Sequence, residues 1–326
     1  MVGRILRGML ILLAIVIFAV IGLLVFLSDS DVRDIEAREK YGKPPSQFIT
    51  LPSGATVHFR DQGQRNGPVL VLLHGSNASL HTWEPWVAQI GDQFRMVSID
   101  LPGHGLTGPV PGDDYSQEAM MQFVNEFTSV MNIERYTLVG QSMGGGVAAR
   151  FAIRYPERLT SLILVNAAGM PTKMPRNPGW AQVIARTPVI QDVLLYVAPR
   201  ILFESALKGS VVNQAIATPE AIDRYWILNR KVGNRAATLK RFQTPFDTFV
   251  KDNVGRITTP TLILWGDKDV ITPPDIGQAY NAAIKGSKLV VFRNIGHLTM
   301  EETPAQSARV VREFLSPAPT GSPPSR

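Results

Sequence analysis

The chain has 326 residues, of which 45% are hydrophobic, and it carries a net charge of +6. This length is enough for one large domain with an insertion or for two small domains. The sequence contains no cysteine, which excludes disulfides, thiolate nucleophiles and cysteine-based metal sites, and it has only five histidines. We therefore predict no metal site and no cofactor.

The N-terminal segment contains a long run without a charged residue, from Gly8 to Leu27. As a helix this run would measure about 30 Å, the thickness of the hydrocarbon core of a bilayer. Arg4 and Arg7 precede the run and acidic residues follow it, which predicts a cytoplasmic N-terminus. We therefore expect a single-pass transmembrane anchor over residues 1–28, with the rest of the protein on the periplasmic or extracytoplasmic side. The alternative is a cleaved signal peptide and a secreted protein, which favours a shorter run and a small-residue cleavage site.

A charged linker, residues 29–44, separates this segment from a regular alternation of apolar strands and helical patterns. The alternation occupies residues 45–169 and returns over residues 257–316. Because parallel strands buried on both faces are continuous runs of apolar residues, this pattern predicts an α/β fold with a mostly parallel sheet and helices on both faces. We predict eight strands, over residues 48–51, 56–60, 69–73, 94–99, 136–139, 159–165, 261–265 and 288–292.

The alternation is interrupted between residues 170 and 256, before the last two predicted strands. This segment has helical stretches, which predict a helical lid over the carboxyl ends of the strands. The helical stretches cover residues 180–186, 190–197, 219–229 and 236–249. Its aromatic and apolar side chains would line a pocket mouth or pack together in a small core. They are Met174, Trp180, Phe203, Tyr225, Trp226 and Phe246.

Lysine and arginine outnumber aspartate and glutamate in the same segment, residues 170–256. The excess is consistent with a solvated helical surface, or with attraction to an anionic membrane surface. The sequence has no nucleic-acid-binding module, so we expect no nucleic-acid partner. The last residues, 317–326, are rich in proline, serine and glycine and are expected to be a disordered tail.

One predicted turn, between a strand and a helix, has the residue pattern of a site for a nucleophilic serine. Residues 140–144 read Gly-Gln-Ser-Met-Gly, and they lie between a predicted strand and a small-residue helical pattern. In this strand–turn–helix context Ser142 sits at the apex of the turn, and the first helical N–H groups, led by Met143, point toward whatever the hydroxyl attacks. The alternative is a glycine-rich turn with an idle serine.

A serine hydroxyl becomes a nucleophile when a base lies within hydrogen-bond reach and a third group orients that base. His297 follows the last predicted strand and fits the role of the base. An acid is expected after the preceding strand, where Asp267 and Asp269 are both candidates. Because the carboxyl ends of parallel strands meet at one edge of the sheet, these side chains are expected to lie together.

The chain resembles the α/β-hydrolase fold family over roughly residues 45–316. The motifs that carry this resemblance are His-Gly-Ser at 74–76, Asp-Leu-Pro-Gly-His-Gly at 100–105, Gly-Gln-Ser-Met-Gly-Gly at 140–145, Trp-Gly-Asp-Lys-Asp at 265–269 and Gly-His at 296–297. The resemblance implies an eight-stranded sheet, a Ser142–Asp269–His297 triad in that chain order, and Asp269 rather than Asp267 as its acid. It also implies an oxyanion hole made by the backbone N–H groups of Ser76 and Met143.

Within the family the chain is similar to lid-bearing esterases, membrane-anchored monoacylglycerol lipases and meta-cleavage C–C hydrolases. The sequence therefore predicts a serine hydrolase that cleaves a small-molecule carboxylic ester through an acyl-enzyme, with a monoacylglycerol or another lipid-derived ester as substrate. A C–C bond hydrolase of the meta-cleavage type is the alternative. A non-catalytic binding protein on the same fold is a further alternative.

Overall fold

The computed structural model of the protein describes residues 2–27, 30–172, 197–245 and 247–316. Eight strands of this part of the chain form a single sheet. The strands are β1 (Ser46–Thr50), β2 (Thr56–Gly63), β3 (Val69–Leu73), β4 (Arg95–Ile99), β5 (Tyr136–Gln141), β6 (Leu159–Val165), β7 (Thr261–Gly266) and β8 (Lys288–Phe292).

The strand order across the sheet is β1-β2-β4-β3-β5-β6-β7-β8. β2 runs antiparallel to both of its neighbours, whereas β3 to β8 all pair in parallel. The register sets Leu73 opposite Gly140 and Val165 opposite Leu264, so the carboxyl ends of β3, β5, β6 and β7 lie at one edge. The predicted α/β fold with a mostly parallel, eight-stranded sheet is confirmed.

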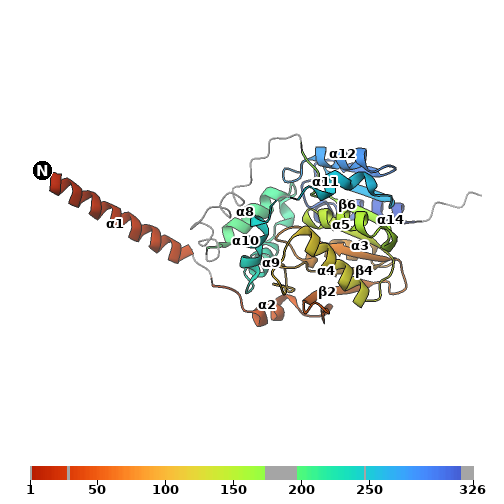
Figure 1. Ribbon diagram of the computed structural model, residues 1–326, viewed down its shortest axis with the longest axis horizontal. Coiled ribbons are helices and arrows are strands. Elements are labelled where there is room, and N and C mark those ends of the chain that lie inside the picture. Colours follow the sequence, from red (N-terminus) through yellow and green to blue (C-terminus); the bar gives the residue numbers. More distant parts are fainter. Residues whose placement is uncertain (1, 28–29, 173–196, 246, 317–326) are drawn as a thin grey trace, which may run out of the picture.

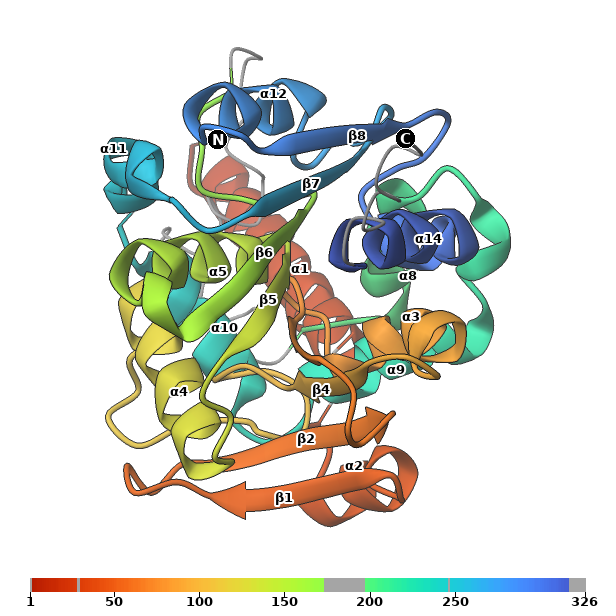
Figure 2. The ribbon, with the colours of Figure 1, turned by 90° about the vertical axis from the view of Figure 1, so that its right-hand side faces the viewer.

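Helices cover both faces of this sheet (Figure 2). One buried apolar cluster joins the sheet to α4, α5, α11 (Phe249–Asn253) and α12, and a second joins the other face to α3 and α14. The helices of this core, with their short 3₁₀ companions, are η1 (Leu80–Trp83), α3 (Glu84–Ile90), α4 (Gln117–Val130), α5 (Met143–Arg154), η2 (Pro156–Arg158), α12 (Pro274–Ala283), α13 (Thr299–Glu302) and α14 (Pro304–Leu315).

The central strands are buried along their whole length because helices exclude water from both of their faces. All six residues of β5 and all six of β7 are buried. Each buried leucine, isoleucine or valine stabilises the fold by about 1.5–3 kcal/mol relative to an exposed one. The resulting sheet edge is a rigid support for the loops that follow the strands.

The described part of the segment between β6 and β7 consists mainly of helices, of which α8, α9 and α10 lie to one side of the sheet (Figure 1). Its described helices are α8 (Arg200–Ser210), η3 (Gln214–Ile216), α9 (Pro219–Asn229), α10 (Asn234–Gln243), α11 (Phe249–Asn253) and η4 (Val254–Arg256). We call α8, α9 and α10, with the loops between them, the insertion.

Three outcomes follow for the helices that the sequence predicts in this segment. The helix predicted over residues 219–229 is confirmed as α9. The single helix predicted over residues 236–249 is wrong, because α10 ends at Gln243 and α11 begins only at Phe249. Thr244 adopts an extended conformation (ψ 130°), as expected of a residue that precedes a proline. The helices predicted over 180–186 and 190–197 fall within or almost entirely within residues 173–196, outside the described residues.

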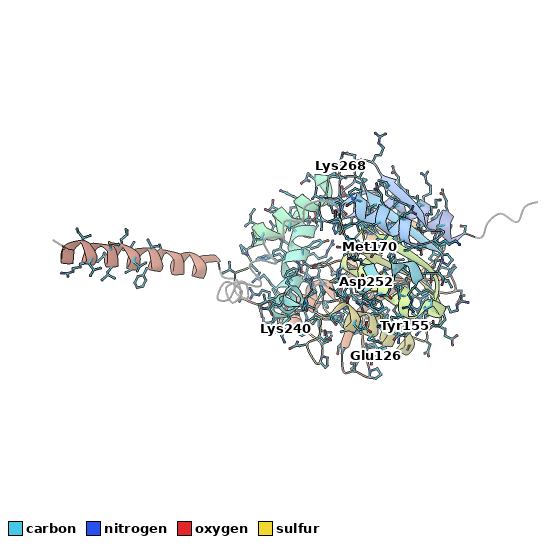
Figure 3. The ribbon with its side chains drawn as sticks, turned by 45° about the horizontal axis from the view of Figure 1, so that its top comes forward. Glu126, Tyr155, Met170, Lys240, Asp252 and Lys268 are labelled. Carbon is cyan, nitrogen blue, oxygen red and sulfur yellow. The ribbon has the colours of Figure 1, made fainter. Side chains whose placement is uncertain are left out.

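The N-terminal residues form α1 (Val2–Leu27), which extends away from the body of the protein (Figures 1 and 3). A helix that crosses a bilayer needs about 20 predominantly apolar residues. Among the residues that the structure describes, no helix combines the length and the apolar character that a membrane crossing requires. The predicted transmembrane anchor over residues 1–28 is therefore wrong, and so is the membrane-anchored localisation that was based on it.

Residues 30–41 lie against the turn between α9 and α10. The Val32 N–H donates to the Arg230 carbonyl at 2.8 Å, and the Val232 N–H donates to the Val32 carbonyl at 3.0 Å. The short helix α2 (Asp34–Tyr41) follows. The N-terminal segment therefore holds the turn between α9 and α10 by backbone hydrogen bonds.

Candidate active site

Ser142 stands at the junction of β5 and α5 in a strained backbone conformation, with φ 50° and ψ −118°. Residues with a side chain seldom adopt a positive φ, and such strain is often found at functional sites. The two glycines of the motif have a steric reason. A Cβ on Gly140 would lie 2.2 Å from the Gly144 carbonyl oxygen, and a Cβ on Gly144 would lie 2.5 Å from the Leu73 carbonyl oxygen. The motif therefore permits α5 to pack directly against the ends of β3 and β5.

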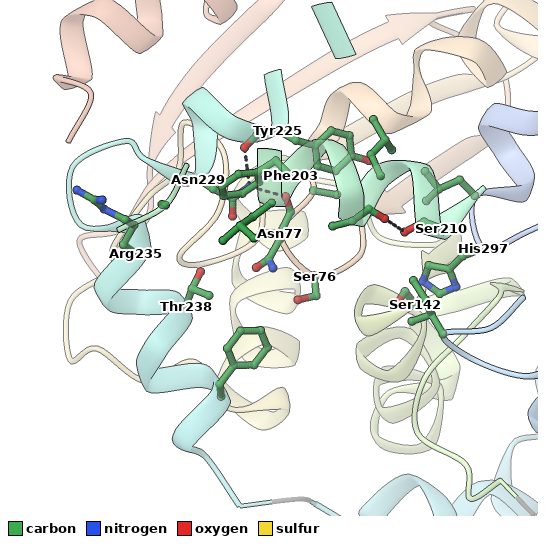
Figure 4. Close-up of a pocket in the computed structure, with 18 of the residues that line it drawn as sticks. Ser76, Asn77, Ser142, Phe203, Ser210, Tyr225, Asn229, Arg235, Thr238 and His297 are labelled. Carbon is green, nitrogen blue, oxygen red and sulfur yellow. Dashed lines mark hydrogen bonds between the residues drawn. The ribbon is translucent and has the colours of Figure 1, made fainter. Parts of the chain in front are cut away.

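His297 comes from the loop after β8 and lines the same cavity as Ser142 (Figure 4). Two backbone contacts fix this loop. The His297 N–H donates to the Ser210 carbonyl at 2.7 Å, and the Gln141 side-chain amide donates to the His297 carbonyl at 3.2 Å. The imidazole thus faces the cavity from a position that both the insertion and the core define.

Asp269 lies behind His297, and its Oδ2 is 2.8 Å from the His297 Nδ1. Because a carboxylate only accepts hydrogen bonds, the proton of this bond sits on Nδ1, which leaves Nε2 as the acceptor. Asp267 instead accepts a hydrogen bond from the Ile295 N–H and lies 4.0 Å from the Lys268 ammonium. The structure therefore brings Asp269, and not Asp267, to the histidine.

The Asp269 carboxylate is buried and accepts several hydrogen bonds. Its Oδ1 accepts from the backbone N–H groups of Ile271 and Thr272, at 2.8 and 2.9 Å. Burial alone raises the pKa of this carboxyl, but His297 and the hydrogen bonds from His297 and Thr272 lower it, and the net pKa lies below its ordinary value of 3.8. The carboxylate is thus ionised at neutral pH and orients the imidazole.

The two backbone N–H groups predicted for an oxyanion hole belong to Ser76 and Met143. Met143 is the first residue of α5, and Ser76 lines the cavity. A Cβ on Gly75 would lie 3.0 Å from the Ser142 Cβ, so the loop that carries Ser76 passes beside the serine. Within the described residues, neither N–H donates a hydrogen bond to the protein. Both are therefore free to donate to a ligand.

The cavity has a volume of about 410 Å³ and separates the strand ends from the insertion. Apolar side chains from the insertion and from the core loops form much of its wall, and the largest are Leu202, Phe203, Leu207, Leu239, Phe242, Ile271 and Leu298. Ser142 and His297 lie at one end of the cavity, and Arg235 and Thr238 lie at the other (Figure 4). The site can therefore hold an elongated, mostly apolar molecule with one end at the serine.

The aromatic and apolar residues that the sequence places either at a pocket mouth or in a small core do not all share one environment. Phe203 and Tyr225 line the cavity, whereas Trp226 donates its indole N–H to the Ala198 carbonyl at 2.9 Å. Met174, Trp180 and Phe246 lie outside the described residues.

A family model for the alpha/beta hydrolase fold matches residues 68–304, which is most of the chain. The protein belongs to the alpha/beta hydrolase family. The match extends from β3 to α14 and thus spans every residue of the predicted triad and oxyanion hole. The protein is accordingly a hydrolase of this fold.

The relatives of this hydrolase carry the names of several different hydrolase activities. A 2-hydroxy-6-oxononadienedioate/2-hydroxy-6-oxononatrienedioate hydrolase of Cupriavidus pinatubonensis is 28% identical over 288 residues, covering 83% of this chain and 95% of the relative. A monoacylglycerol lipase of Xenopus laevis is 24% identical over 267 residues, covering 77% of this chain and 76% of the relative. The solved structure of a thermophilic esterase from Thermogutta terrifontis aligns with a TM-score of 0.68 and 27% identity, covering 83% of this chain and 97% of that one.

The candidate acid, Asp269, is also held by residues that the sequence motifs do not mark. The Asn166 side-chain amide donates to Asp269 Oδ2 at 2.7 Å, and the Asn166 Oδ1 accepts from the Thr299 hydroxyl at 2.6 Å. The Thr272 hydroxyl lies 2.7 Å from Asp269 Oδ2 and 3.0 Å from the Asn166 carbonyl oxygen. Asn166 directly follows β6, and its place at the functional edge of the sheet is the one signal that could have identified it.

His74 and His104 belong to two of the family motifs, and their rings are hydrogen-bonded to backbone groups of the loops beside the site. Leu101 N–H donates to the His74 Nε2 at 3.0 Å, so the proton of this ring is on Nδ1, which donates to the Gly75 carbonyl at 2.7 Å. His104 Nδ1 lies 2.9 Å from the Pro102 carbonyl. Burial lowers the pKa of both imidazoles. Both rings are therefore neutral and brace the loops beside the site.

Proposed function

We propose that this hydrolase cleaves carboxylic esters through a Ser142–His297–Asp269 triad. One observation supports this proposal above all others. An imidazole oriented by a buried carboxylate, with 2.8 Å between Nδ1 and Oδ2, shares a cavity with a serine on a strained strand-to-helix turn. This is the set of groups that activates a serine for acyl transfer.

The proposed reaction assigns one role to each of these groups. His297 Nε2 takes the Ser142 hydroxyl proton while the serine oxygen bonds to the ester carbonyl carbon. Asp269 accepts the hydrogen bond from the Nδ1–H group of His297 and stabilises the imidazolium. His297 passes its proton to the alkoxy oxygen, the C–O bond breaks, and the alcohol leaves an acylated Ser142. Water, deprotonated by His297, attacks the acyl carbon and releases the acid, and the proton returns to Ser142.

The negative oxygen of each tetrahedral intermediate is held by the N–H groups of Ser76 and Met143. A donor of this kind is worth about 3–4 kcal/mol in the transition state. Because both N–H groups lack an acceptor within the described protein, they bind this oxygen without first breaking another hydrogen bond.

The apolar wall of the cavity supports an acyl chain of medium length, and a monoacylglycerol is our proposed substrate type. The names of the Xenopus laevis lipase and the Thermogutta terrifontis esterase are in keeping with an ester substrate. We further propose that residues 170–256 act as a lid over the catalytic core, residues 45–169 and 257–316.

The test is hydrolysis of a series of p-nitrophenyl esters, from acetate to palmitate, by the full-length protein and its Ser142→Ala variant. We expect one chain length to be preferred and turnover to fall by several orders of magnitude in the variant. Equal turnover in the two proteins would exclude Ser142 as the nucleophile.

C–C bond hydrolysis of the meta-cleavage type is a second candidate, because the Cupriavidus pinatubonensis relative is named a 2-hydroxy-6-oxononadienedioate/2-hydroxy-6-oxononatrienedioate hydrolase. The same triad would serve this reaction. A 2-hydroxy-6-oxo-dienoate tested beside the ester series separates the two. A protein that cleaves this compound in a Ser142-dependent manner and leaves every ester intact would replace the ester proposal.

A further inference from the structure

The loop that carries Ser76 is held from outside the catalytic core. Asn77, the next residue, adopts a left-handed conformation with φ 59°. Its backbone carbonyl accepts a hydrogen bond from the Asn229 side-chain amide at 2.7 Å, and its side-chain Oδ1 accepts from the Arg241 Nη2 at 2.8 Å. Asn229 ends α9 and Arg241 lies on α10, so both donors belong to the insertion. Figure 4 shows the Asn77–Asn229 bond at the cavity wall.

These donors are themselves fixed. The Asn229 amide also donates to the Tyr225 carbonyl within α9, at 2.8 Å. The Asn234 side chain, at the start of α10, donates to the Gly105 carbonyl of the core at 3.0 Å. The turn between the two helices is hydrogen-bonded to Val32 of the N-terminal segment. The α9–α10 pair is thus fixed relative to the core. Its two hydrogen bonds to Asn77 hold Asn77 in a defined position.

Arg241 adds a charge to this contact. Its side chain is partly buried, and its guanidinium lies 4.6 Å from the centre of the Phe242 ring. Within the described part of the chain Arg241 forms no ion pair with a carboxylate, and its burial lowers its pKa to about 10. It therefore remains a cation at neutral pH, and its positive potential beside the Ser76 loop is not cancelled by a paired anion. Such a potential favours a negative oxygen nearby.

We infer that Asn229 and Arg241 are positioning residues for the oxyanion hole. They act through Asn77 to hold the Ser76 N–H in place, so the insertion is part of the catalytic machinery as well as a wall of the cavity. This inference rests on the proposed function, because it concerns the oxyanion of the same acyl-transfer reaction.

The expected signature is specific to the transition state. The oxyanion exists only after Ser142 has attacked, so a displaced Ser76 N–H weakens binding of the tetrahedral intermediate and leaves binding of the uncleaved ester unchanged. Loss of either donor should therefore lower kcat and leave KM unchanged. A merely structural role would lower the melting temperature and the fraction of active protein instead.

The experiment compares full-length Arg241→Met, Arg241→Lys and Asn229→Ala with the wild type. Three quantities are measured: kcat and KM for the preferred p-nitrophenyl ester, the rate at which a fluorophosphonate labels Ser142, and the melting temperature. The fluorophosphonate also places a negative oxygen in the hole, and its reaction does not depend on which ester is the substrate. Lys240→Met is the matched control. It removes a neighbouring charge from α10, but Lys240 is half-exposed and pairs with Asp113 instead of Asn77.

We expect kcat and the labelling rate to fall together by about tenfold in Arg241→Met and Asn229→Ala, with KM within threefold of the wild type. Arg241→Lys keeps the charge and should recover part of the loss, and Lys240→Met should match the wild type. Unchanged kcat and labelling in an active protein would overturn the inference, as would a loss of kcat that only parallels a loss of folded protein.

The labelling rate separates this inference from the proposed function. If the wild type hydrolyses no ester but is labelled at Ser142 in an Arg241-dependent manner, the ester substrate is wrong and the inference stands. If esters are hydrolysed equally well by the wild type, Arg241→Met and Asn229→Ala, the function stands and the inference is wrong. A wild type that neither hydrolyses nor reacts would contradict both.

Discussion

The candidate acid Asp269 and the proposed oxyanion hole are held by different parts of the molecule. We call their surroundings the acid end and the oxyanion end of the site. Among the described residues, every hydrogen-bond partner of the Asp269 carboxylate comes from the core: Asn166, Ile271, Thr272 and His297. The loop of Ser76 and Asn77 is held by two side chains of the insertion. The comparison indicates that the carboxylate of Asp269 is held by the core alone, whereas the proposed oxyanion hole depends on the insertion as well. The backbone of His297 contacts both parts, because its N–H donates to the Ser210 carbonyl of α8.

The largest expected effect is on the acid end. Asp269→Asn keeps the shape of the side chain but removes the charge, and it permits the wrong imidazole tautomer. We expect kcat for ester hydrolysis to fall by about 10⁴. Asp267→Asn is the matched control, because Asp267 is two residues away and does not contact His297. Equal effects of the two changes in steady-state kinetics would mean that the acid is wrongly assigned.

A smaller effect is expected where one hydrogen bond to the acid is removed. Thr272→Val retains the shape of the side chain and loses the hydroxyl 2.7 Å from Asp269 Oδ2. A hydrogen bond to a charged group contributes about 1.5–3 kcal/mol, so we expect kcat to fall by roughly tenfold or more. Thr272→Ser should restore most of the rate. Full activity in Thr272→Val would show that the remaining donors are sufficient to hold the carboxylate.

The insertion should also influence substrate binding, through the cavity wall. Phe203→Ala removes a large apolar side chain from this wall. We expect KM for long-chain p-nitrophenyl esters to rise by about tenfold, equivalent to about 1.4 kcal/mol, with kcat and the short-chain esters little affected. A change confined to kcat would place Phe203 with the positioning residues instead.

The smallest expected effect is a pH dependence of stability from the acid end. The pKa of Asp269 is lower in the folded protein than its ordinary value of 3.8, so ionised Asp269 stabilises the fold above about pH 4. This contribution is lost as pH falls through the lower, folded-state pKa. We therefore expect the difference in unfolding free energy between the wild type and Asp269→Asn to shrink below pH 4 in urea titrations. A difference that grows there would contradict the assigned direction.

The sequence was sufficient to predict the sheet and to locate most of the chemistry. The buried parallel strands are recognisable as short continuous runs of apolar residues. The motifs after β3, β5, β7 and β8 mark the loops at one edge of the sheet. Ser142 and His297 could therefore be proposed from strand ends, whereas the choice of Asp269 over Asp267 was implied by the family resemblance. The structure places Asp269 beside His297, and His297 in the cavity with Ser142.

What the sequence did not predict are contacts between residues that are distant in the chain. Asn77 and Arg241 are 164 residues apart, and their contact depends on how α10 packs over the core loops. The pairing of Asn166 with Asp269, over 103 residues, depends in the same way on neighbouring strands. The anchor prediction relied on the length of the charge-free run and on the charges that flank it. It is wrong, because the described helices include none able to cross a membrane.

The most direct test of the central claim is to trap the acyl-enzyme. Full-length protein mixed with p-nitrophenyl butyrate and quenched during turnover is digested, and the acylated peptide is located by mass spectrometry. The proposed mechanism predicts a burst of p-nitrophenol, a butyryl group on Ser142, and no adduct in Ser142→Ala. Turnover with no covalent adduct, or with the butyryl group on another residue, would contradict the mechanism.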